Sequence, residues 1–255
     1  MSGRTRAPAV RRLSLLQGAD SVAGLCVVID VFRAGTFACH ALAGGALAVV
    51  PAGSVEEARA LKARNPGWIL AGERGGVILP GFEMGNSPAL LMNMDVRGRT
   101  IIHATSAGSR GVLQASRRSG TVIMACFSNT SAAAGFVIST GADEVTLLAM
   151  GDAGTTNAAE DEEFASFFEK TLADGGRPPD PGPWFSRIVR SGATRRFMES
   201  VEPSMPQADV PACLAVDTTV SVPVLGSLED GTPALVDAAA DRLNETRDGW
   251  RVDNE

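Results

Sequence analysis

Six short, continuous apolar runs recur along the first 150 residues, with segments of helical pattern between them. Apolar runs of this length that do not alternate with polar residues are typical of strands buried on both faces of a parallel sheet. The alternation with helices predicts βαβ units, and hence a three-layer α/β/α fold with a largely parallel or mixed central sheet. The expected strands are residues 25–29, 46–50, 68–71, 100–104, 121–125 and 145–149; the expected helices are 55–64, 88–94, 128–140 and 160–173.

The two ends of the chain differ from this regular middle. Residues 1–20 carry arginines but lack the apolar run of a signal peptide, so we expect a flexible N-terminal segment. A stretch rich in Gly and Pro at 174–183 reads as a linker. Beyond it we expect a helix at 184–199 and short strands near 214–216 and 220–225. We therefore predict one domain over residues 21–243, with a C-terminal extension after the linker and a polar tail at 244–255.

Composition narrows the class of protein. The chain has 255 residues, 45% of them apolar and 20% charged, which is ordinary for a globular protein, and its net charge of −6 argues against nucleic acid as a partner. The uncharged stretch 37–55 is interrupted by His40, Gly44 and Pro51, so no membrane span is expected. Four scattered cysteines without a C-x-x-C pair indicate free thiols and a cytoplasmic protein. With only two histidines, a zinc site or a Ser-His-Asp triad is poorly supported.

Polar and charged residues follow nearly every predicted strand. Ligands bind at the carboxyl ends of strands in parallel sheets, so these residues would gather at one edge. Each has a simpler explanation on its own: Asp30 and Asp152 as helix N-caps, the acids at 160–163 as partners of the helix dipole, the arginines as surface residues. Because all of these residues are expected at one edge of the sheet, a ligand-binding site is favoured over the separate explanations. The segments concerned are Asp30 to Arg33, Glu73 to Gly76, Thr105 to Gly111, Ser128 to Ser131, Gly151-Asp152 and Glu160-Asp161.

The chemistry of these residues points to phosphate. Carboxylates without His or Cys suit Mg²⁺, which takes one or two protein carboxylates plus waters and substrate phosphate. Arginines suit phosphate, sulfonate or carboxylate groups through forked hydrogen bonds. The chain contains no P-loop, no G-x-G-x-x-G, no cysteine-phosphatase loop and no D-x-D at Asp30. The residues therefore favour a Mg²⁺-dependent phosphatase acting on a small, multiply anionic metabolite.

Several blocks resemble the 2-phosphosulfolactate phosphatase (ComB-type) family. The specific ones are G-E-R-G-G at 72–76 and G-N-S-P at 85–88, and the segment V-I-D-V-F-R-A at 28–34 supports them. Thr105 to Arg110 is similar to the family's T-x-N-G-T-R turn, with Ala107 in place of Asn and with Ser106 and Ser109 in place of threonines. The likeness spans about residues 25–225. The altered turn makes phosphatase chemistry a firmer expectation than the family's own substrate.

The resemblance implies hydrolysis of 2-phosphosulfolactate to 3-sulfolactate and phosphate with Mg²⁺, a step toward coenzyme M. By position, the expected metal ligands are Asp30, Glu73, Glu160 and Asp161, of which Asp30, Glu73 and Asp161 are also catalytic candidates. The expected substrate-binding residues are Arg33, Arg74, Asn86, Ser106, Gly108, Ser109, Arg110, Ser128 and Asn129.

Two other functions stay open at this stage. A catalytically silent protein that binds or senses small anions would keep the arginines together without a convergence of the carboxylates. A nucleotide-dependent transferase would need an adenine pocket, which no motif announces. A homodimer is a plausible assembly for a domain of this type.

Overall fold

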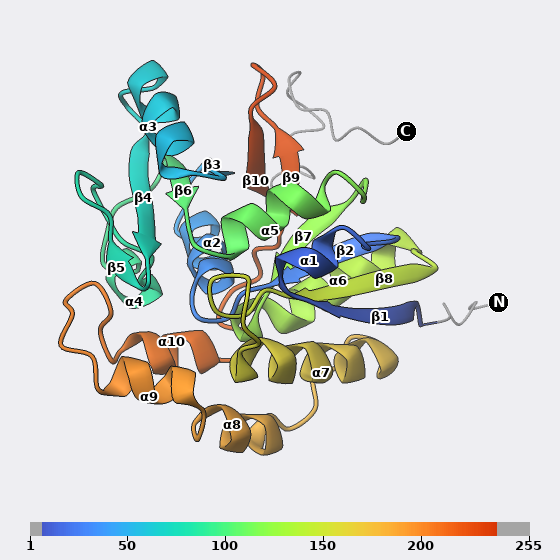
Figure 1. Cartoon of the computed structure of the whole chain (residues 1–255). Coiled ribbons are helices and arrows are strands. Elements are labelled where there is room, and N and C mark those ends of the chain that lie inside the picture. The colour runs from blue at the N-terminus through green and yellow to red at the C-terminus, as the bar shows by residue number, and fades with distance from the viewer. Residues whose placement is uncertain (1–6, 239–255) are drawn as a thin grey trace.

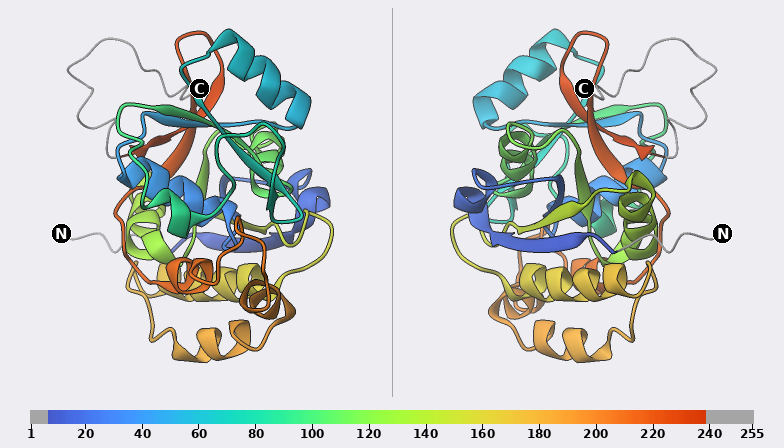
Figure 2. Two further views of the ribbon diagram at one scale, coloured as in Figure 1. Left: turned by 90° about the vertical axis from the view of Figure 1, so that its left-hand side faces the viewer. Right: turned by 90° about the vertical axis from the view of Figure 1, so that its right-hand side faces the viewer.

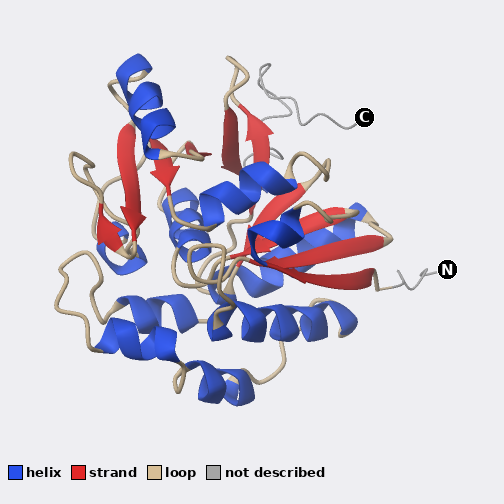
Figure 3. Cartoon of the chain, in the orientation of Figure 1, coloured by secondary structure: helices blue, strands red, loops and turns tan. Residues whose placement is uncertain are grey.

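The computed structural model describes residues 7–238, and within them the strands form one mixed sheet of ten. The order is β1-β8-β2-β7-β9-β10-β3-β6-β4-β5. Figure 3 shows helices on both sides of the strands, so the predicted three-layer α/β/α class is confirmed. The strands are β1 Ala9–Ser14, β2 Leu25–Ile29, β3 Ala48–Pro51, β4 Ile69–Arg74, β5 Val77–Ile78, β6 Thr100–Ala104, β7 Val122–Ala125, β8 Glu144–Ala149, β9 Pro223–Ser227 and β10 Pro233–Asp237.

Ten α-helices lie within the same residues. They are α1 Leu15–Ala19, α2 Ala34–Ala43, α3 Val55–Arg64, α4 Pro88–Leu91, α5 Gly108–Ala115, α6 Thr130–Thr140, α7 Ala159–Ala173, α8 Gly182–Ile188, α9 Gly192–Met198 and α10 Asp209–Leu214. None of the described helices is long and apolar enough to cross a membrane.

The sheet consists of two parallel groups separated by an antiparallel hairpin. Strands β1, β8, β2 and β7 pair in parallel, and so do β3, β6 and β4. The hairpin β9–β10 stands between the groups and pairs with β7 on one side and β3 on the other, antiparallel in both cases (Figure 1). One antiparallel neighbour reverses the strand direction, and three in succession leave the two groups running in opposite senses.

Alternate residues of the central strands face two different cores. In β2, Val27 and Ile29 belong to the cluster formed with α6 and α7, whereas Cys26 and Val28 belong to the cluster formed with α2 and α5. This is the period of two that strand geometry dictates. Both sets of side chains are fully buried, which explains why the sequence shows a continuous apolar run.

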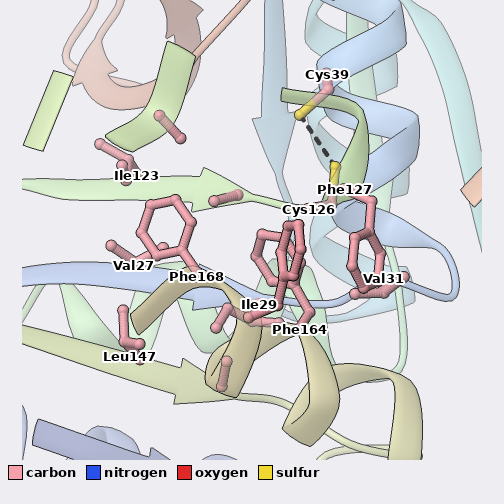
Figure 4. Close-up of a cluster of buried hydrophobic side chains, with 14 of the residues drawn as sticks. Val27, Ile29, Val31, Cys39, Ile123, Cys126, Phe127, Leu147, Phe164 and Phe168 are labelled. Carbon is pink, nitrogen blue, oxygen red and sulfur yellow. Dashed lines mark hydrogen bonds between the residues drawn. The ribbon is translucent and has the colours of Figure 1, made fainter. Parts of the chain in front are cut away.

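Aromatic side chains dominate the core on the α7 side of the sheet. Phe127, Phe164 and Phe168 are fully buried and belong to the same cluster as Val27 and Ile29 of β2 (Figure 4). The rings of Phe127 and Phe164 meet edge to face with centroids 4.8 Å apart, a favoured aromatic geometry. Cys39 and Cys126 meet in the same cluster, with their sulfur atoms 3.6 Å apart. All four cysteines are buried and free, as predicted.

The structure differs from the sequence-based expectations near both ends. Within the segment expected to be flexible, residues 9–19 form β1 and α1, and β1 pairs with β8 over six residues. Residues 214–216 are not a strand, because Leu214 ends α10. The expected helix at 184–199 is two helices, α8 and α9, which a turn at 189–191 separates. The expected polar tail at 244–255 lies outside the described residues.

The C-terminal helices lie together at one end of the molecule. Helices α8, α9 and α10 follow α7 and gather on its side of the fold, away from the β9–β10 hairpin (Figures 1 and 2). The chain then returns through β9 and β10 into the middle of the sheet. The segment after the linker is therefore part of the main fold rather than a separate appendage.

Candidate active site

A cavity of about 510 Å³ lies where the carboxyl ends of the two parallel groups meet. Residues that follow β2 and β8 line one part of it, and residues at the ends of β4 and β6 line another. In a flat sheet, groups of opposite sense would have their carboxyl ends at opposite edges. Here residues from the carboxyl ends of both groups line the same cavity, so the site does not lie along one straight edge of the sheet. The predicted site residues that line it are Asp30, Arg33, Glu73, Asn86, Ser106 and Glu160.

Asp30 ends the β2 run and is 6% exposed. Its Oδ1 accepts a hydrogen bond from the amide of Ala34 at 3.0 Å, so the carboxylate is fixed at the start of α2. Gly108 begins α5 against the other oxygen: a Cβ on Gly108 would lie 2.7 Å from Oδ2 of Asp30. Gly108 therefore makes room for the carboxylate. Burial, with the nearby charge of Glu73, raises the pKa of Asp30 to about 6.

Glu160 lies in the first turn of α7 and is 4% exposed. Its Oε2 is buried and has no hydrogen-bond partner among the described residues. Burial is the main cause that raises its pKa, to about 7, and the charge of Asp30 adds to the effect. Two buried carboxylates thus line one cavity, and the charge of Asp30 raises the proton affinity of Glu160.

Glu73 organises the G-E-R-G-G turn. Arg74 pairs with Val77 across the β4–β5 hairpin, so Gly75 and Gly76 form its two-residue loop, with φ values of 60° and 89°. Tight hairpin turns of this kind require positive φ, which explains the two glycines. The Glu73 carboxylate accepts the amide of Gly76 at 2.7 Å and that of Ser106 at 2.8 Å. It therefore joins the end of β4 to the turn after β6.

Asp161 is the next residue after Glu160 but does not line the cavity. Its two oxygens accept the amide of Val31 at 2.7 Å and the amide of Gly151 at 2.8 Å. It therefore holds together the loops that follow β2 and β8. Burial, with the charges of Asp30 and Glu160, raises the pKa of Asp161 well above its usual range.

Arg33 lines the cavity, but its charge is already paired. It is 2% exposed and forms an ion pair with Asp209, which is 1% exposed, at 2.9 Å. The same guanidinium donates to the carbonyl oxygens of Ser204 and Gly76, at 2.6 and 2.8 Å. Arg33 thus ties α10 and the hairpin turn to the loop after β2, which is a different role from the anion binding that its position predicts.

The remaining predicted binding residues divide into two sets. Asn86 and Ser106 line the cavity, and Oδ1 of Asn86 is 2.8 Å from Nε2 of His103. The others have partners in the fold and do not line it. Arg74 donates to backbone carbonyls, Ser109 closes the turn with Thr105, Arg110 is exposed, and Ser128 and Asn129 are fully buried beside Cys126.

Two further charged residues belong to the cavity wall, and of these only Asp152 lies in a segment that the sequence placed at the site. Arg196 of α9 lines the cavity and contacts Asp152 at 3.3 Å. Asp152 follows β8, and the sequence offers a helix N-cap as its simpler explanation. Arg196 follows no predicted strand and belongs to no recognised motif, so no sequence signal places it at the site.

The four predicted metal ligands do not form a single ligand set. Over residues 7–238, no three Asp, Glu, His or Cys side chains are close enough to hold one metal ion. Backbone amides engage both oxygens of Glu73 and of Asp161. Asp30 and Glu160 remain as the pair of buried carboxylates on the cavity wall, and the Oε2 atom of Glu160 still lacks a partner.

The fold and this site define an α/β enzyme with an acidic cavity at the carboxyl ends of its strands. The sequence matches the model of the 2-phosphosulpholactate phosphatase family over residues 12–227, and the chain belongs to that family. The resemblance drawn from its motifs is therefore confirmed, and with it the interpretation of the chain as a phosphoric monoester hydrolase.

Similar curated proteins are found in bacteria and in an archaeon. A probable 2-phosphosulfolactate phosphatase of Thermus thermophilus is 32% identical over 214 residues, covering 78% of this chain and 86% of the relative. A protein of the same description from Thermoplasma acidophilum is 30% identical, with 80% and 87% covered. One from Deinococcus radiodurans is 30% identical, with 66% and 70% covered.

Proposed function

We propose that this protein is a Mg²⁺-dependent phosphatase that hydrolyses 2-phosphosulfolactate to 3-sulfolactate and inorganic phosphate. Water adds to phosphorus, the ester oxygen leaves with the hydroxy acid, and the proton of the water passes to that oxygen or to solvent. The observation that carries the proposal is the cavity wall formed by Asp30 and Glu160, two buried carboxylates at the carboxyl ends of strands in a member of this family.

The donor set fits Mg²⁺. This ion prefers one or two carboxylates and keeps several waters, which suits Asp30 and Glu160. The buried Oε2 of Glu160 has no hydrogen-bond partner among the described residues, which leaves it available to a cation. When bound, Mg²⁺ would supply charge stabilisation for the transferred phosphoryl group.

Other residues of the chain would position the substrate. Glu73 holds the turn at Ser106 and the turn at Gly76 in a fixed relation through two short hydrogen bonds. Asn86 lines the cavity, and its side chain is fixed by the contact between its Oδ1 and Nε2 of His103. Fixed dipoles of this kind favour a charged transition state because they need not reorganise during the reaction.

The charges of the protein and of the proposed substrate support a cation at the site. The proposed substrate carries phosphate, sulfonate and carboxylate groups, whereas the protein has a net charge of −6. An acidic cavity binds such a molecule only together with a cation, which is a second argument for the metal. Four free, buried cysteines are consistent with a reducing cytoplasm.

Phosphate release by the purified protein tests the proposal. The substrates are 2-phosphosulfolactate and 2-phospholactate, each assayed with Mg²⁺ and with EDTA. We expect release that EDTA abolishes, and a fall of at least a hundredfold in Asp30→Asn and in Glu160→Gln, because charge-stabilising groups of this kind contribute factors of this order. Glu169→Gln is the matched control, since Glu169 lies on the same helix but is half exposed and contacts Arg12.

The outcomes separate the enzyme from its main alternative. Release that survives EDTA would contradict the metal proposal. No release from either substrate, together with binding of these anions in calorimetry, would refute the phosphatase and support the anion-binding protein.

A further inference from the structure

The cavity is lined by two cations, and only one of them is available to a ligand. The lining contains Arg33 and Arg196 as its basic side chains. Arg33 is buried and neutralised by Asp209, as described above. Arg196 has a side chain that is 45% exposed, and among residues 7–238 it forms one ion pair, a 3.3 Å contact with Asp152, itself 59% exposed. Solvent-exposed pairs of this kind are weak, so exchange of Asp152 for another anion costs little.

The position of Arg196 is set by the packing of its neighbour. Phe197 is 2% exposed, and its ring lies 5.4 Å from the ring of Phe32 and 5.2 Å from the guanidinium carbon of Arg33. These contacts anchor α9 to the loop after β2. Because Phe197 is fixed against that loop, Arg196 is held at the cavity wall rather than free on the surface.

Depth separates Arg196 from the buried carboxylates. Asp30 and Glu160 are 6% and 4% exposed, whereas Arg196 is nearly half exposed and therefore stands at the mouth of the same cavity. In 2-phosphosulfolactate the sulfonate is one carbon further from the phosphate-bearing carbon than the carboxylate is. If the phosphate lies near Asp30 and Glu160, the sulfonate is the anionic group that extends furthest toward the mouth.

We propose that Arg196 is the residue that recognises the sulfonate of the substrate, exchanging Asp152 for it on binding. This inference rests on the proposed function, and it assigns a specificity-determining role to a residue of the C-terminal helices. A guanidinium and a sulfonate form charge-assisted hydrogen bonds, which are stronger than those between neutral groups.

Two substrates that differ only in the sulfonate test the assignment. 2-Phospholactate keeps the phosphate and the carboxylate and replaces the sulfonomethyl group by methyl. Loss of a hydrogen bond to a charged group corresponds to about a tenfold to a hundredfold change in affinity. We expect Arg196→Gln to raise KM for 2-phosphosulfolactate by that factor, with kcat changed less than about threefold and KM for 2-phospholactate changed less than about twofold.

Arg195→Gln is the matched control. Arg195 is the preceding residue of α9, is exposed, and lies outside the cavity wall, so its loss should leave both KM values unchanged. Arg196→Lys should bind 2-phosphosulfolactate more tightly than Arg196→Gln, because lysine keeps the positive charge but lacks the forked N–H donors of the guanidinium. Equal effects of Arg196→Gln on the two substrates, or none on either, would overturn the assignment.

A binding measurement separates this inference from the proposed function. If the unaltered protein releases no phosphate from either substrate, the proposed function fails, and calorimetry with 3-sulfolactate then decides the role of Arg196. Binding that falls at least tenfold in Arg196→Gln but not in Arg195→Gln supports a sulfonate site. No binding to the unaltered protein, or equal binding to all three proteins, refutes it.

Discussion

The buried ion pair between Arg33 and Asp209 provides the sharpest test of how this fold holds its site. Its atoms are 2.9 Å apart and both side chains are almost fully buried. The other oxygen of Asp209 accepts the hydroxyl of Ser87 at 2.6 Å and the amide of Ala89 at 3.1 Å. One carboxylate thus joins the loop after β2, the start of α4 and α10. Asp209→Asn keeps its size and removes its charge.

The expected loss follows from the burial of the partner. When one member of a buried pair is removed, the other charge stays out of water without compensation, which costs about 3–5 kcal/mol. In a chain of this size each kcal/mol lowers the melting temperature by about 2–4 °C, so Asp209→Asn should melt about 6–20 °C below the parent protein.

Thermal and urea unfolding followed by circular dichroism measure the effect. Asp95→Asn is the control, because Asp95 pairs with Arg97 at the same distance of 2.9 Å while both side chains are well exposed. That change should shift the midpoint very little. A second comparison combines Arg33→Met with Asp209→Leu: removing both charges should cost less than the sum of the single changes. An Asp209→Asn midpoint no lower than that of Asp95→Asn would refute the reasoning.

Three further changes test other parts of the structure. Gly108→Ala should lower phosphate release at least tenfold and destabilise the fold by about 1–3 kcal/mol, because the added Cβ would press on Oδ2 of Asp30. Phe127→Ala should cost about 3–5 kcal/mol in urea unfolding, since the side chain is fully buried among other rings. Burial lowers the pKa of His103 to about 3. The unfolded chain therefore binds a proton at this residue below pH 6.5, whereas the folded protein does not bind it until about pH 3, and the folded protein loses stability in between. His103→Gln should reduce this loss of stability on acidification.

The controls for these changes are specific. Gly135→Ala in α6 meets no atom within 4 Å and should stabilise the protein slightly, so an equal loss at both glycines would contradict the close approach to Asp30. For His103, the predicted loss is about 1.4 kcal/mol for each pH unit between 6.5 and 3. The raised pKa values of Asp30 and Glu160 act in the opposite direction, adding stability as the pH falls from about 7 toward 4. The free energy of unfolding is therefore measured against pH for both His103→Gln and the parent protein. Identical slopes in the two proteins would contradict the prediction.

The central strands and several of the helices between them were predicted from local pattern, although α5 was not among the expected helices. The predicted run at 25–29 coincides with β2, and 100–104 with β6; the helix at 55–64 coincides with α3, where Ser54 accepts the amide of Glu57 as the capping pattern predicts. A strand that is buried on both faces needs apolar residues at every position, so it is recognisable in the sequence as a continuous apolar run. β1 was missed because it lies at the edge of the sheet, where Arg11 and Arg12 pair with acids instead of entering a core.

The candidate site was predicted in part, and the division follows a physical rule. The sequence shows which residues follow a strand, and Asp30, Glu73 and Glu160 are indeed on the cavity wall. The sequence does not show which polar side chains form hydrogen bonds or ion pairs within the fold and are therefore not free to bind a ligand. Arg33 forms an ion pair with Asp209, and Asp161 accepts a hydrogen bond from the amide of Val31; both partners are distant in the chain.

By itself, the sequence determined the class of fold, the family and the identity of the carboxylates, because these depend on patterns within short segments. Only the tertiary structure decided that residues from two parallel groups of opposite sense line one cavity, with the β9–β10 hairpin between the groups. It also decided that Arg196, from a helix after the linker, joins the wall. Contacts between segments far apart in the chain depend on how strands pair and helices cross, and no local pattern of residues encodes that choice.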